Sequence, residues 1–252
     1  MIKKPNYFVM TVCLLFISNS AVAEINYNAL SLNHEIVAKY ESGYKGYRAV
    51  SKDNYGGYSY GKLQISTKRK NNRLSTFDYF MRYIKKHDTQ IYDKLYKAGG
   101  YEAAFKGDRI FVDEWNSLSS DKNFIELYNN FIFDTQIIPV YERLANNHYN
   151  NVLEWCYEDE NVQAAINSMI IQHGPGGAYN IIKQVFMNKD VLNKRNFVEK
   201  LYDYRIMKFV KYKKRYLAEK ADILNNLKKE NIKQVEIKQE ISILNKLYSI
   251  FS

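Results

Sequence analysis

Cysteine and histidine are both scarce, with two cysteines and four histidines in 252 residues. Cys13 lies in an N-terminal segment that we expect to be removed, so Cys156 would have no partner for an internal disulfide. A fold without disulfides depends on its hydrophobic core. Because the histidines show no paired spacing, we predict no metal site and no cofactor. The four histidines are His34, His87, His148 and His173.

Signatures of other catalytic classes are also missing. We find no paired cysteine and histidine nucleophile signature. The stretch Gly174-Pro175-Gly176-Gly177 is too short for a loop that cradles phosphates. These absences argue against cysteine hydrolases and against nucleotide-binding enzymes.

The first 23 residues have the three-part layout of a secretory signal peptide. Lys3 and Lys4 precede an apolar run, Tyr7 to Ile17, and small residues then end at Ala21-Val22-Ala23. The run is about eleven residues long, whereas a membrane-spanning helix needs about 20, so a retained anchor is the weaker interpretation. We predict cleavage after Ala23, an exported protein that is periplasmic or secreted, and no integral membrane segment in the remaining chain.

Positive charge exceeds negative charge, with 37 lysines and arginines against 27 acidic residues and a net charge of +10. An exported cation is expected to prefer polyanions, and export favours an anionic cell wall or membrane surface over nucleic acid. The alternative is that an AT-rich genome enriches lysine, asparagine, tyrosine and isoleucine. The 23 tyrosines fit both explanations, because tyrosine is also a stacking surface in sugar-binding sites.

Hydrophobic spacing predicts a mainly α protein with one small antiparallel β-hairpin. Apolar residues recur at helical spacing from Asn26 to Tyr40, and Gly43 and Gly46 then end this helix. The glycines and alternating residues of Tyr47 to Ile65 indicate the hairpin. Later helices are predicted at Leu74 to Lys86, Thr89 to Lys97, Tyr101 to Phe105, Asp108 to Leu118, Lys122 to Asn146, Asn161 to Gln172, Gly177 to Met187, and from Lys194 onward.

The composition changes near Lys211, and residues 211–252 contain no glycine or proline. Leu217, Ile223, Leu224 and Leu227 begin an amphipathic stripe whose polar side is rich in lysine. We favour a helical hairpin packed on the domain, and a partner-binding or membrane-surface helix is the alternative. We therefore predict a signal peptide in residues 1–23, a globular domain in 24–210 and a basic amphipathic helical extension in 211–252.

Glu41 is the best candidate for an acid catalyst. The segment Tyr40-Glu41-Ser42-Gly43 closes the first predicted helix, and several tyrosines follow. A glutamate at a helix end, partly desolvated by aromatic rings, can keep its proton near neutral pH, as glycoside cleavage requires. Asp53 in the hairpin is a candidate second carboxylate. The alternative roles are a helix-end salt bridge for Glu41 and an Asx turn for Asp53.

The order of these residues resembles the lysozyme-like superfamily. Glu41-Ser42-Gly43, then Asp53, then Gly56-Gly57-Tyr58-Ser59-Tyr60-Gly61-Lys62-Leu63-Gln64-Ile65 is similar to the core of goose-type lysozymes, lytic transglycosylases, chitosanase-like members and the muramidase domains of secreted bacterial effectors. The resemblance implies an α+β lysozyme-like catalytic domain in residues 24–210, with the hairpin lining its cleft. It also implies that Glu41 is the general acid, that Asp53 is the second carboxylate, and that the substrate contacts Tyr58, Ser59, Tyr60 and Gln64.

A second segment, Ser168 to Ala178, resembles the helix, turn and helix beside the cleft in the effector-type members. The resemblance implies that Gln172 and His173 lie next to the substrate. For His173 itself, a turn histidine bonded to backbone is favoured over a proton carrier. Two helical segments, Phe133 to Gln136 and Tyr202 to Arg205, resemble the same group less specifically.

The resemblance leads us to expect a muramidase that cuts the β-1,4 bond between N-acetylmuramic acid and N-acetylglucosamine in peptidoglycan. A chitosanase- or chitinase-like glycosidase and a non-catalytic wall-binding module are the alternatives. Hydrolysis and lytic transglycosylation both fit these residues. We expect a monomer that binds peptidoglycan glycan strands and no nucleic acid, with a secretion machine or an inhibitor as its protein partner.

Overall fold

Helices dominate the computed structural model, which describes residues 24–32, 35–53, 56–71, 73–187, 191 and 193–227. The strands are β1 (Val50–Lys52), β2 (Tyr58–Tyr60) and β3 (Ile65–Ser66). The α-helices are α1 (Glu35–Ser42), α2 (Thr76–His87), α3 (Thr89–Lys97), α4 (Gly100–Lys106), α5 (Arg109–Leu118), α6 (Lys122–Ile132), α7 (Ile138–Asn146), α8 (Asn150–Glu158), α9 (Glu160–Met187) and α10 (Lys194–Lys208). The remaining elements are the 3-10 helices η1 (Tyr27–Ala29), η2 (Gly46–Arg48) and η4 (Val210–Tyr212), the π-helix η3 (Phe133–Ile137), and a final helix that is described over residues 213–227.

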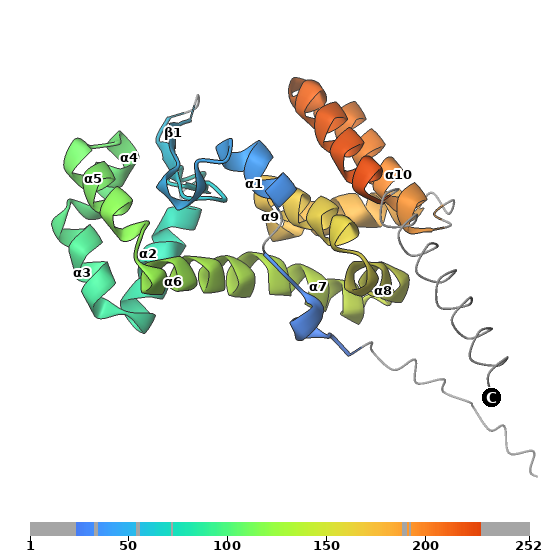
Figure 1. Cartoon of the computed structure of the whole chain (residues 1–252), viewed down its shortest axis with the longest axis horizontal. Helices are drawn as coiled ribbons and strands as arrows, with labels where there is room; N and C mark the ends of the chain where they lie inside the picture. Colours follow the sequence, from blue (N-terminus) through green and yellow to red (C-terminus); the bar gives the residue numbers. More distant parts are fainter. Residues whose placement is uncertain are drawn as a thin grey trace, which may run out of the picture.

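The elements form two groups joined by one long helical rod (Figure 1). The sheet and helices α2 to α5 lie at one end, and α8 to α10 with the helix of residues 213–227 lie at the other. The rod consists of α6, η3 and α7 in succession, where the sequence predicts one helix from Lys122 to Asn146. Helix α1 and the first half of α9 meet between the two groups. The predicted α+β class with a lysozyme-like arrangement is therefore confirmed.

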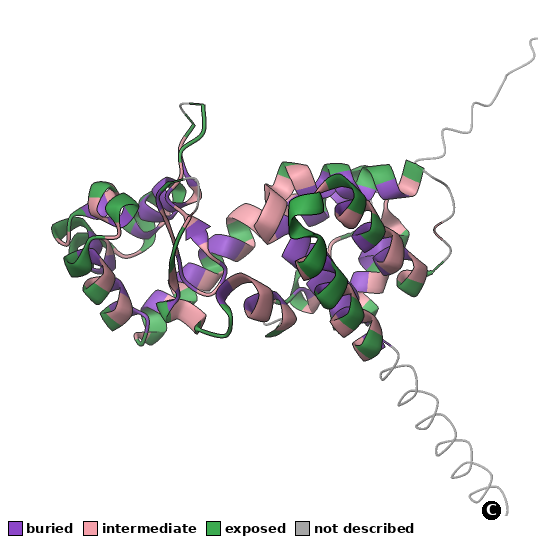
Figure 2. Ribbon diagram, turned by 90° about the horizontal axis from the view of Figure 1, so that it is seen from above, coloured by how far each residue is buried: buried purple, intermediate pink, exposed green. Residues whose placement is uncertain are grey.

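The sheet is antiparallel in the order β1-β2-β3, one strand more than the predicted hairpin. Val50 pairs with Tyr60 and Ser59 pairs with Ser66. Strands β1 and β2 project from the body in both views (Figures 1 and 2). Because successive side chains of a strand point to opposite faces, this register decides which hairpin residues enter the core.

Two of the predicted helix boundaries follow from single residues. Gly174 has φ 71° and ψ 168° inside α9, so the helix is broken there, between the predicted segments Asn161 to Gln172 and Gly177 to Met187. The N-cap side chain of Ser75 accepts a hydrogen bond from the N–H of Asp78, and Asp78 reciprocates, which fixes the start of α2. Helix α8 is missing from the sequence prediction, although its buried Val152, Leu153 and Cys156 have helical spacing.

The predicted continuous helix from Asn26 to Tyr40 is wrong. Among the described residues before α1, η1 is the helical element, and the backbone of residues 29–31 bonds to side chains of α9. Gln163 Oε1 accepts from the N–H of Ser31 at 2.8 Å, and its Nε2 donates to the carbonyl of Ala29 at 2.6 Å. Asn167 donates to the carbonyl of Ser31 at 2.9 Å. These bonds satisfy backbone groups that a helix would have paired internally.

An aromatic cluster holds the sheet against the helices at the left of Figure 1. Trp115 lies at its centre, fully buried, with Tyr60 at 5.1 Å and Phe124 at 5.0 Å between ring centroids. The Trp115 indole donates to the carbonyl of Tyr47 at 2.9 Å, which anchors the start of the hairpin. Aromatic pairs of this kind add about 0.5–1.5 kcal/mol each beyond their burial.

The helix of residues 213–227 packs into the core of the second group (Figure 2). Tyr216, Ile223 and Leu227 are buried in the same cluster as the residues of α9 and α10, whereas Leu217, predicted on the apolar stripe, is 48% exposed. The domain boundary near residue 210 stays a prediction, and residues 228–252 of the predicted extension lie outside the described residues. None of the helices in the described part of the chain combines the length and apolar character needed to cross a membrane.

Two substitutions on this helix test how far it contributes to stability. Ile223→Ala removes a fully buried side chain and should lower the free energy of unfolding by about 2–5 kcal/mol. Leu217→Ala, on the same helix but half-exposed, should change it by less than about 0.5 kcal/mol. Denaturant unfolding of both variants measures the difference, and equal effects would contradict a packed helix.

Candidate functional site

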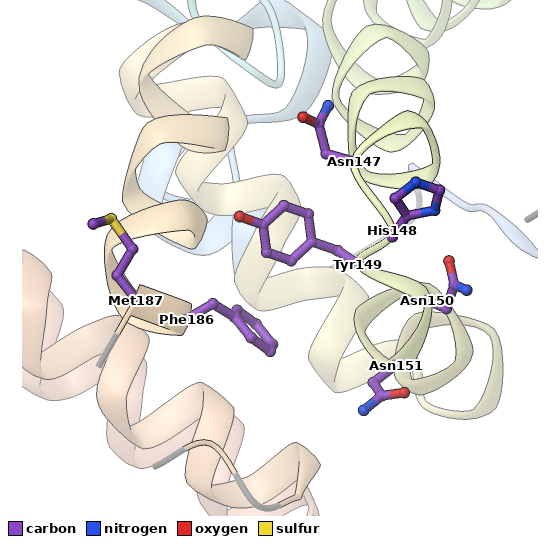
Figure 3. A pocket seen from close by; sticks show the side chains of 7 residues that line it. All are labelled: Asn147, His148, Tyr149, Asn150, Asn151, Phe186 and Met187. Atoms are coloured by element: carbon purple, nitrogen blue, oxygen red, sulfur yellow. The ribbon is translucent and has the colours of Figure 1, made fainter. Parts of the chain in front are cut away.

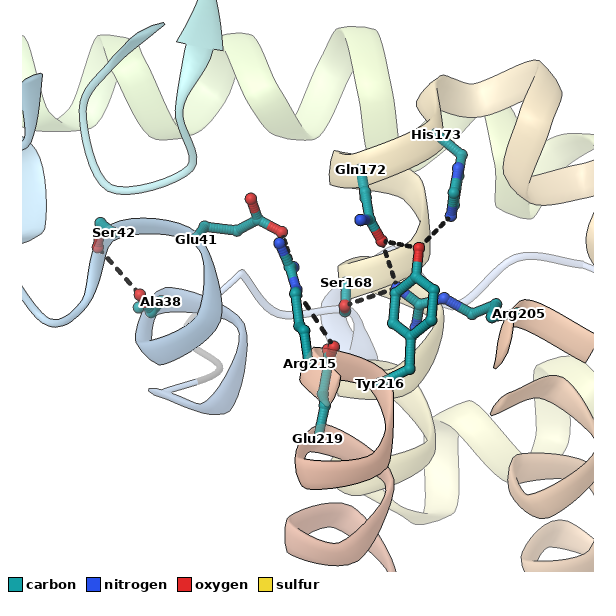
Figure 4. A network of polar contacts seen from close by, with 10 residues as sticks. All are labelled: Ala38, Glu41, Ser42, Ser168, Gln172, His173, Arg205, Arg215, Tyr216 and Glu219. Atoms are coloured by element: carbon teal, nitrogen blue, oxygen red, sulfur yellow. Dashed lines mark hydrogen bonds and ion pairs between the residues drawn. The ribbon is translucent and has the colours of Figure 1, made fainter. Parts of the chain in front are cut away.

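Glu41 lies in the last turn of α1, where the helix ends in a run of left-handed residues. Ser42 Oγ donates to the carbonyl of Ala38 at 3.0 Å, and Gly43, Tyr44 and Gly46 have φ between 58° and 65°. A left-handed residue after the last turn is the usual way for a helix to stop. The Glu41 side chain is 10% exposed and points from α1 toward the helix of residues 213–227 (Figure 4).

Arg215 is the direct partner of the Glu41 carboxylate. Its guanidinium donates to Glu41 Oε1 from the helix of residues 213–227, and its Nε lies 3.7 Å from Oε2 of Glu219. The Glu219 side chain has no exposed surface. A neighbouring contact ties the same two helices together, because Asp222 accepts from Lys39 at 2.6 Å and from Tyr40 at 2.8 Å.

Burial and charge act in opposite directions on Glu41. Burial raises the pKa of its carboxyl group and the negative charge of Glu219 adds to this, whereas Arg215 and the more distant Arg205 lower it. The desolvation effect is the largest, so the pKa lies above the ordinary value. Because Arg215 bonds to Oε1, Oε2 is the oxygen that can carry a proton. The site therefore holds a carboxyl group suited to donating a proton.

A second set of polar contacts continues from this pair toward α9 (Figure 4). Arg205, fully buried on α10, donates to Gln172 Oε1 at 2.8 Å and to Ser168 Oγ at 3.4 Å. The Tyr216 hydroxyl donates to the same Gln172 oxygen at 2.8 Å and lies 3.3 Å from Nε2 of His173. Gln172 and His173, both predicted from the sequence, thus lie in this second set of contacts, and their predicted contact with substrate stays a prediction.

His173 is held neutral by its surroundings. Burial, followed by the positive charges of Arg205 and Arg215, lowers its pKa from 6.5 to about 4. Its ring stacks on Phe209, with 4.4 Å between centroids. A neutral, packed imidazole does not carry a proton at neutral pH. Its polar contact here is the Tyr216 hydroxyl, and the predicted backbone bond of a turn histidine stays a prediction.

The predicted hairpin residues divide between two faces of the sheet. Tyr60 is fully buried and its hydroxyl donates to the carbonyl of Ala104 at 2.8 Å, so the predicted contact of Tyr60 with substrate does not agree with its position. Tyr58 is half-buried against Gly107 on the same side. Ser59 points to the opposite face, as does its cross-strand partner Ser51.

Gln64 joins this second face. Its side-chain oxygen accepts from the hydroxyl of Ser51, and its amide donates to the carbonyl of Gly61 at 2.9 Å. Gly61 has φ 79°, and a Cβ there would lie 2.5 Å from the ring of Tyr128. The Tyr128 hydroxyl in turn accepts from the N–H of Leu63 at 3.0 Å. The glycine is thus required for the close approach of α6, which fixes the turn that presents Gln64.

The letters Gly57-Tyr58-Ser59-Tyr60-Gly61 also fit the Gly-x-Ser-x-Gly pattern of serine hydrolases. In those enzymes the serine occupies a sharp turn between a strand and a helix. Here Ser59 lies in the middle of β2, between its partners Ser51 and Ser66. This position does not suit a nucleophile.

Asp53 follows directly after β1 in the turn of the projecting hairpin. Its N–H donates to the carbonyl of Gly57 at 3.0 Å, and its carbonyl accepts from Gly56 at 3.1 Å. These two backbone bonds join Asp53 to Gly56 and Gly57. The predicted role of Asp53 as second carboxylate remains a prediction.

Arg215, Glu219 and Asp222 are not among the site residues predicted from the sequence. All three lie in the segment predicted as a separate basic extension. One signal was available: Arg215 and Glu219 are four residues apart and therefore share a helix face. Arg205 ends the segment Tyr202 to Arg205, which resembles the effector-type lysozyme-like domains, but no role was predicted for it.

A hollow of about 430 Å³ at the junction of α7, α8 and α9 lies apart from this network (Figure 3). Its lining contains no carboxyl group, so it offers no acid for general acid catalysis. The lining residues are Asn147, His148, Tyr149, Asn150, Asn151, Phe186 and Met187. Within the described residues, no group of three or more histidines, cysteines or acidic residues is placed to hold a metal ion.

A family model and several solved structures of known proteins are similar to this chain. The family model described as "Type VI secretion system spike protein VgrG3-like, C-terminal" matches residues 34–234. A Gynuella sunshinyii GH46 chitosanase in complex with chitotetraose superimposes with a TM-score of 0.53 and 14% identity, over 78% of this chain and 86% of that one. A native chitosanase from Bacillus subtilis MY002 gives a TM-score of 0.52 and 18% identity, over 82% and 91%. Among curated proteins no sequence match was found.

At these identities the two chitosanase structures establish a shared fold. They confirm the predicted lysozyme-like, chitosanase-like fold. The matched residues of the family model include both Glu41 and Arg215, so the network described above lies wholly within the family region.

The depressed pKa of His173 predicts an acid-dependent loss of stability. Between pH 6.5 and about 4 the unfolded chain binds a proton at this residue that the folded chain does not, so the folded state loses stability as pH falls through that window. His173→Gln should lose less stability between pH 7 and 4 than the wild type, as measured by the unfolding midpoint at each pH. His87→Gln, at an exposed position on α2, is the matched control. Identical pH slopes for the wild type and His173→Gln would rule out this coupling.

Proposed function

We propose that this chain, which belongs to the family of type VI secretion system spike protein VgrG3-like C-terminal domains, is a glycosidase that cuts the glycan strands of peptidoglycan. The bond attacked is the β-1,4 linkage between N-acetylmuramic acid and N-acetylglucosamine, and Glu41 is the general acid. The observation that carries the proposal is the position of Glu41 at a helix end, 10% exposed, with a raised pKa and one oxygen held by Arg215.

The chemistry requires one proton transfer and one nucleophile. Glu41 Oε2 gives its proton to the glycosidic oxygen as the bond from that oxygen to the anomeric carbon breaks. The electron-poor carbon is then attacked by water, which gives its proton to Asp53 and yields a reducing end, or by the sugar's own 6-hydroxyl, which gives its proton to the Glu41 carboxylate and yields a 1,6-anhydro end. The carboxylate left on Glu41 is stabilised by Arg215. Asp53 is the proposed second carboxylate for the water-dependent route.

Charge favours peptidoglycan over chitosan as the substrate. Chitosan is a polymer of glucosamine and carries positive charge, whereas muramic acid and its peptides carry carboxylates. The chain has a net charge of +10, so its long-range field attracts the second polymer and repels the first. The chitosanase likeness supports a scaffold that accommodates an amino-sugar chain. The presence of Glu41 in its network argues against a non-catalytic wall-binding module.

The family name supports a protein that acts outside the cell that makes it. A spike protein of a secretion system is exported, and the predicted signal peptide in residues 1–23, which lies outside the described residues, would lead to the same side of the membrane. We therefore place the protein in the periplasm or medium, with a component of a secretion machine or an inhibitor as its protein partner.

Replacing the acid should abolish activity. Glu41→Gln keeps the shape of the side chain but cannot donate a proton, and loss of acid catalysis typically costs about 10²–10⁴-fold in rate. Release of soluble fragments from purified sacculi measures the effect. Glu35→Gln, on the exposed side of the same helix, is the matched control and should be fully active. Activity of Glu41→Gln within a few fold of wild type contradicts the assignment.

The same assay, run on chitosan beside sacculi, decides between the two substrates. Turnover of chitosan and none of sacculi would establish the chitosanase alternative. Turnover of neither polymer by the wild type would favour the non-catalytic module. Mass spectrometry of the fragments distinguishes reducing ends from 1,6-anhydro ends, and thereby the hydrolase from the lytic transglycosylase.

Asp53→Asn tests the second carboxylate. If Asp53 acts on the water or on the developing positive charge, turnover should fall by at least about tenfold with an unchanged unfolding midpoint. If it only closes the turn, asparagine replaces it well, because both residues favour such turns. Near-normal turnover would remove Asp53 from the mechanism and favour attack by the 6-hydroxyl.

A further inference from the structure

A second hollow, of about 450 Å³, lies between α2 and the π-helix η3. Phe131 is fully buried at its base, and Tyr79, Tyr83 and Gln136 are among the residues that line it. It shares no lining residue with the Glu41 network. The segment Phe133 to Gln136, which resembles lysozyme-like sequences but has no place in the proposed mechanism, lies beside it.

Two tyrosines give the hollow an aromatic wall. Tyr79 and Tyr83 are one helical turn apart on α2 and so lie on one face. Tyr79 is 50% exposed. The hydroxyl of Tyr83 donates to Asp134 at 2.9 Å. Its ring stacks on His87, with 4.2 Å between centroids. These two contacts hold the Tyr83 side chain in place. An aromatic face with a polar tip is the surface on which the apolar face of a sugar ring stacks.

Two cations line the same hollow. Arg82 and Lys86 are also one turn apart on α2, and both are exposed. Neither has a hydrogen bond or ion pair with any residue that the structure describes. The exposed Asp134 is bonded to Tyr83. A guanidinium and an ammonium beside an aromatic wall, both without an acidic partner in the described chain, match a sugar that carries a carboxylate.

The backbone that faces α2 across the hollow is π-helical. Residues Phe133–Ile137 form a π-helix within the long rod, where the Thr135 hydroxyl donates to the carbonyl of Phe131 at 2.7 Å. Single π-helical turns are rare and occur frequently at functional sites. This turn places the hydroxyl of Thr135 and the amide of Gln136 in the lining, and such groups can bond to sugar hydroxyl and acetamido groups.

We propose that this hollow is a second carbohydrate-binding site, which takes a carboxylate-bearing amino sugar of a glycan strand. Tyr79 and Tyr83 stack on the sugar, and Arg82 and Lys86 bind the carboxylate. The choice of a muramic-acid glycan rests on the proposed function, but the site itself does not. It would keep the enzyme on an insoluble polymer between cleavage events.

Binding of catalytically inactive protein to sacculi tests the proposal. In a Glu41→Gln background, which prevents digestion, Tyr79→Ala and the double substitution Arg82→Gln with Lys86→Gln should each weaken binding to pelleted sacculi by about tenfold or more. The matched controls are on α3: Tyr96→Ala, and Lys94→Gln with Lys97→Gln, which remove one tyrosine ring and two positive charges from exposed positions of the neighbouring helix. The controls should bind as the parent does.

Two further experiments test whether the ligand needs its carboxylate and separate the second binding site from the proposed glycosidase activity. Sacculi with amidated carboxyl groups should bind the parent weakly, and the double substitution should cause no additional loss. In the active background, the same substitutions should leave cleavage of a short soluble muropeptide unchanged. Equal binding by the α2 and α3 variants overturns the site, and unchanged binding to amidated sacculi overturns the carboxylate. Digestion of sacculi by the Glu41→Gln parent would contradict the proposed function, whereas equal binding by the α2 and α3 variants would contradict only the second site.

Discussion

The burial of opposite charges around Glu41 is the constraint on which the second half of the structure depends. Glu41 and Glu219 contribute two carboxyl groups, and Arg205 and Arg215 two guanidiniums, so acidic and basic side chains are equal in number. A charge left alone in such a place would cost about 3–5 kcal/mol. The balance therefore requires α1, α10 and the helix of residues 213–227 to meet at one point. The Asp222 contacts with Lys39 and Tyr40 hold two of them in that arrangement.

The sheet is positioned by a different kind of interaction. Tyr60 and Trp115 lock its inner face into the aromatic cluster, and Tyr128 touches Gly61 so closely that only glycine fits. This leaves Ser51, Ser59 and Gln64 on the outer face as the polar groups that the hairpin can offer a ligand. Apolar packing thus fixes the sheet, whereas charge pairing fixes the carboxyl group of Glu41.

Residues that lie close together in the sequence were enough to predict helix ends and turns. The glycines after Glu41, the turn residues of the hairpin and the spacing of the later helices were sufficient to place Glu41 at a helix end and to identify the fold class. Features that depend on distant partners were not predictable. The segment before α1 is non-helical because Gln163 and Asn167 bond to its backbone. Tyr60 points inward because of the strand register, and Arg215 reaches Glu41 only when the two helices pack.

The pairing of Glu41 with Arg215 joins residues that are 174 positions apart. A chain is synthesised from its N-terminus at about 5–20 residues per second, so α1 leaves the ribosome well before the residue that orients its carboxyl group. Until residue 215 has been made, Glu41 lacks the guanidinium that bonds to its carboxyl group. A chain interrupted before residue 215 therefore contains Glu41 without its direct ionic partner.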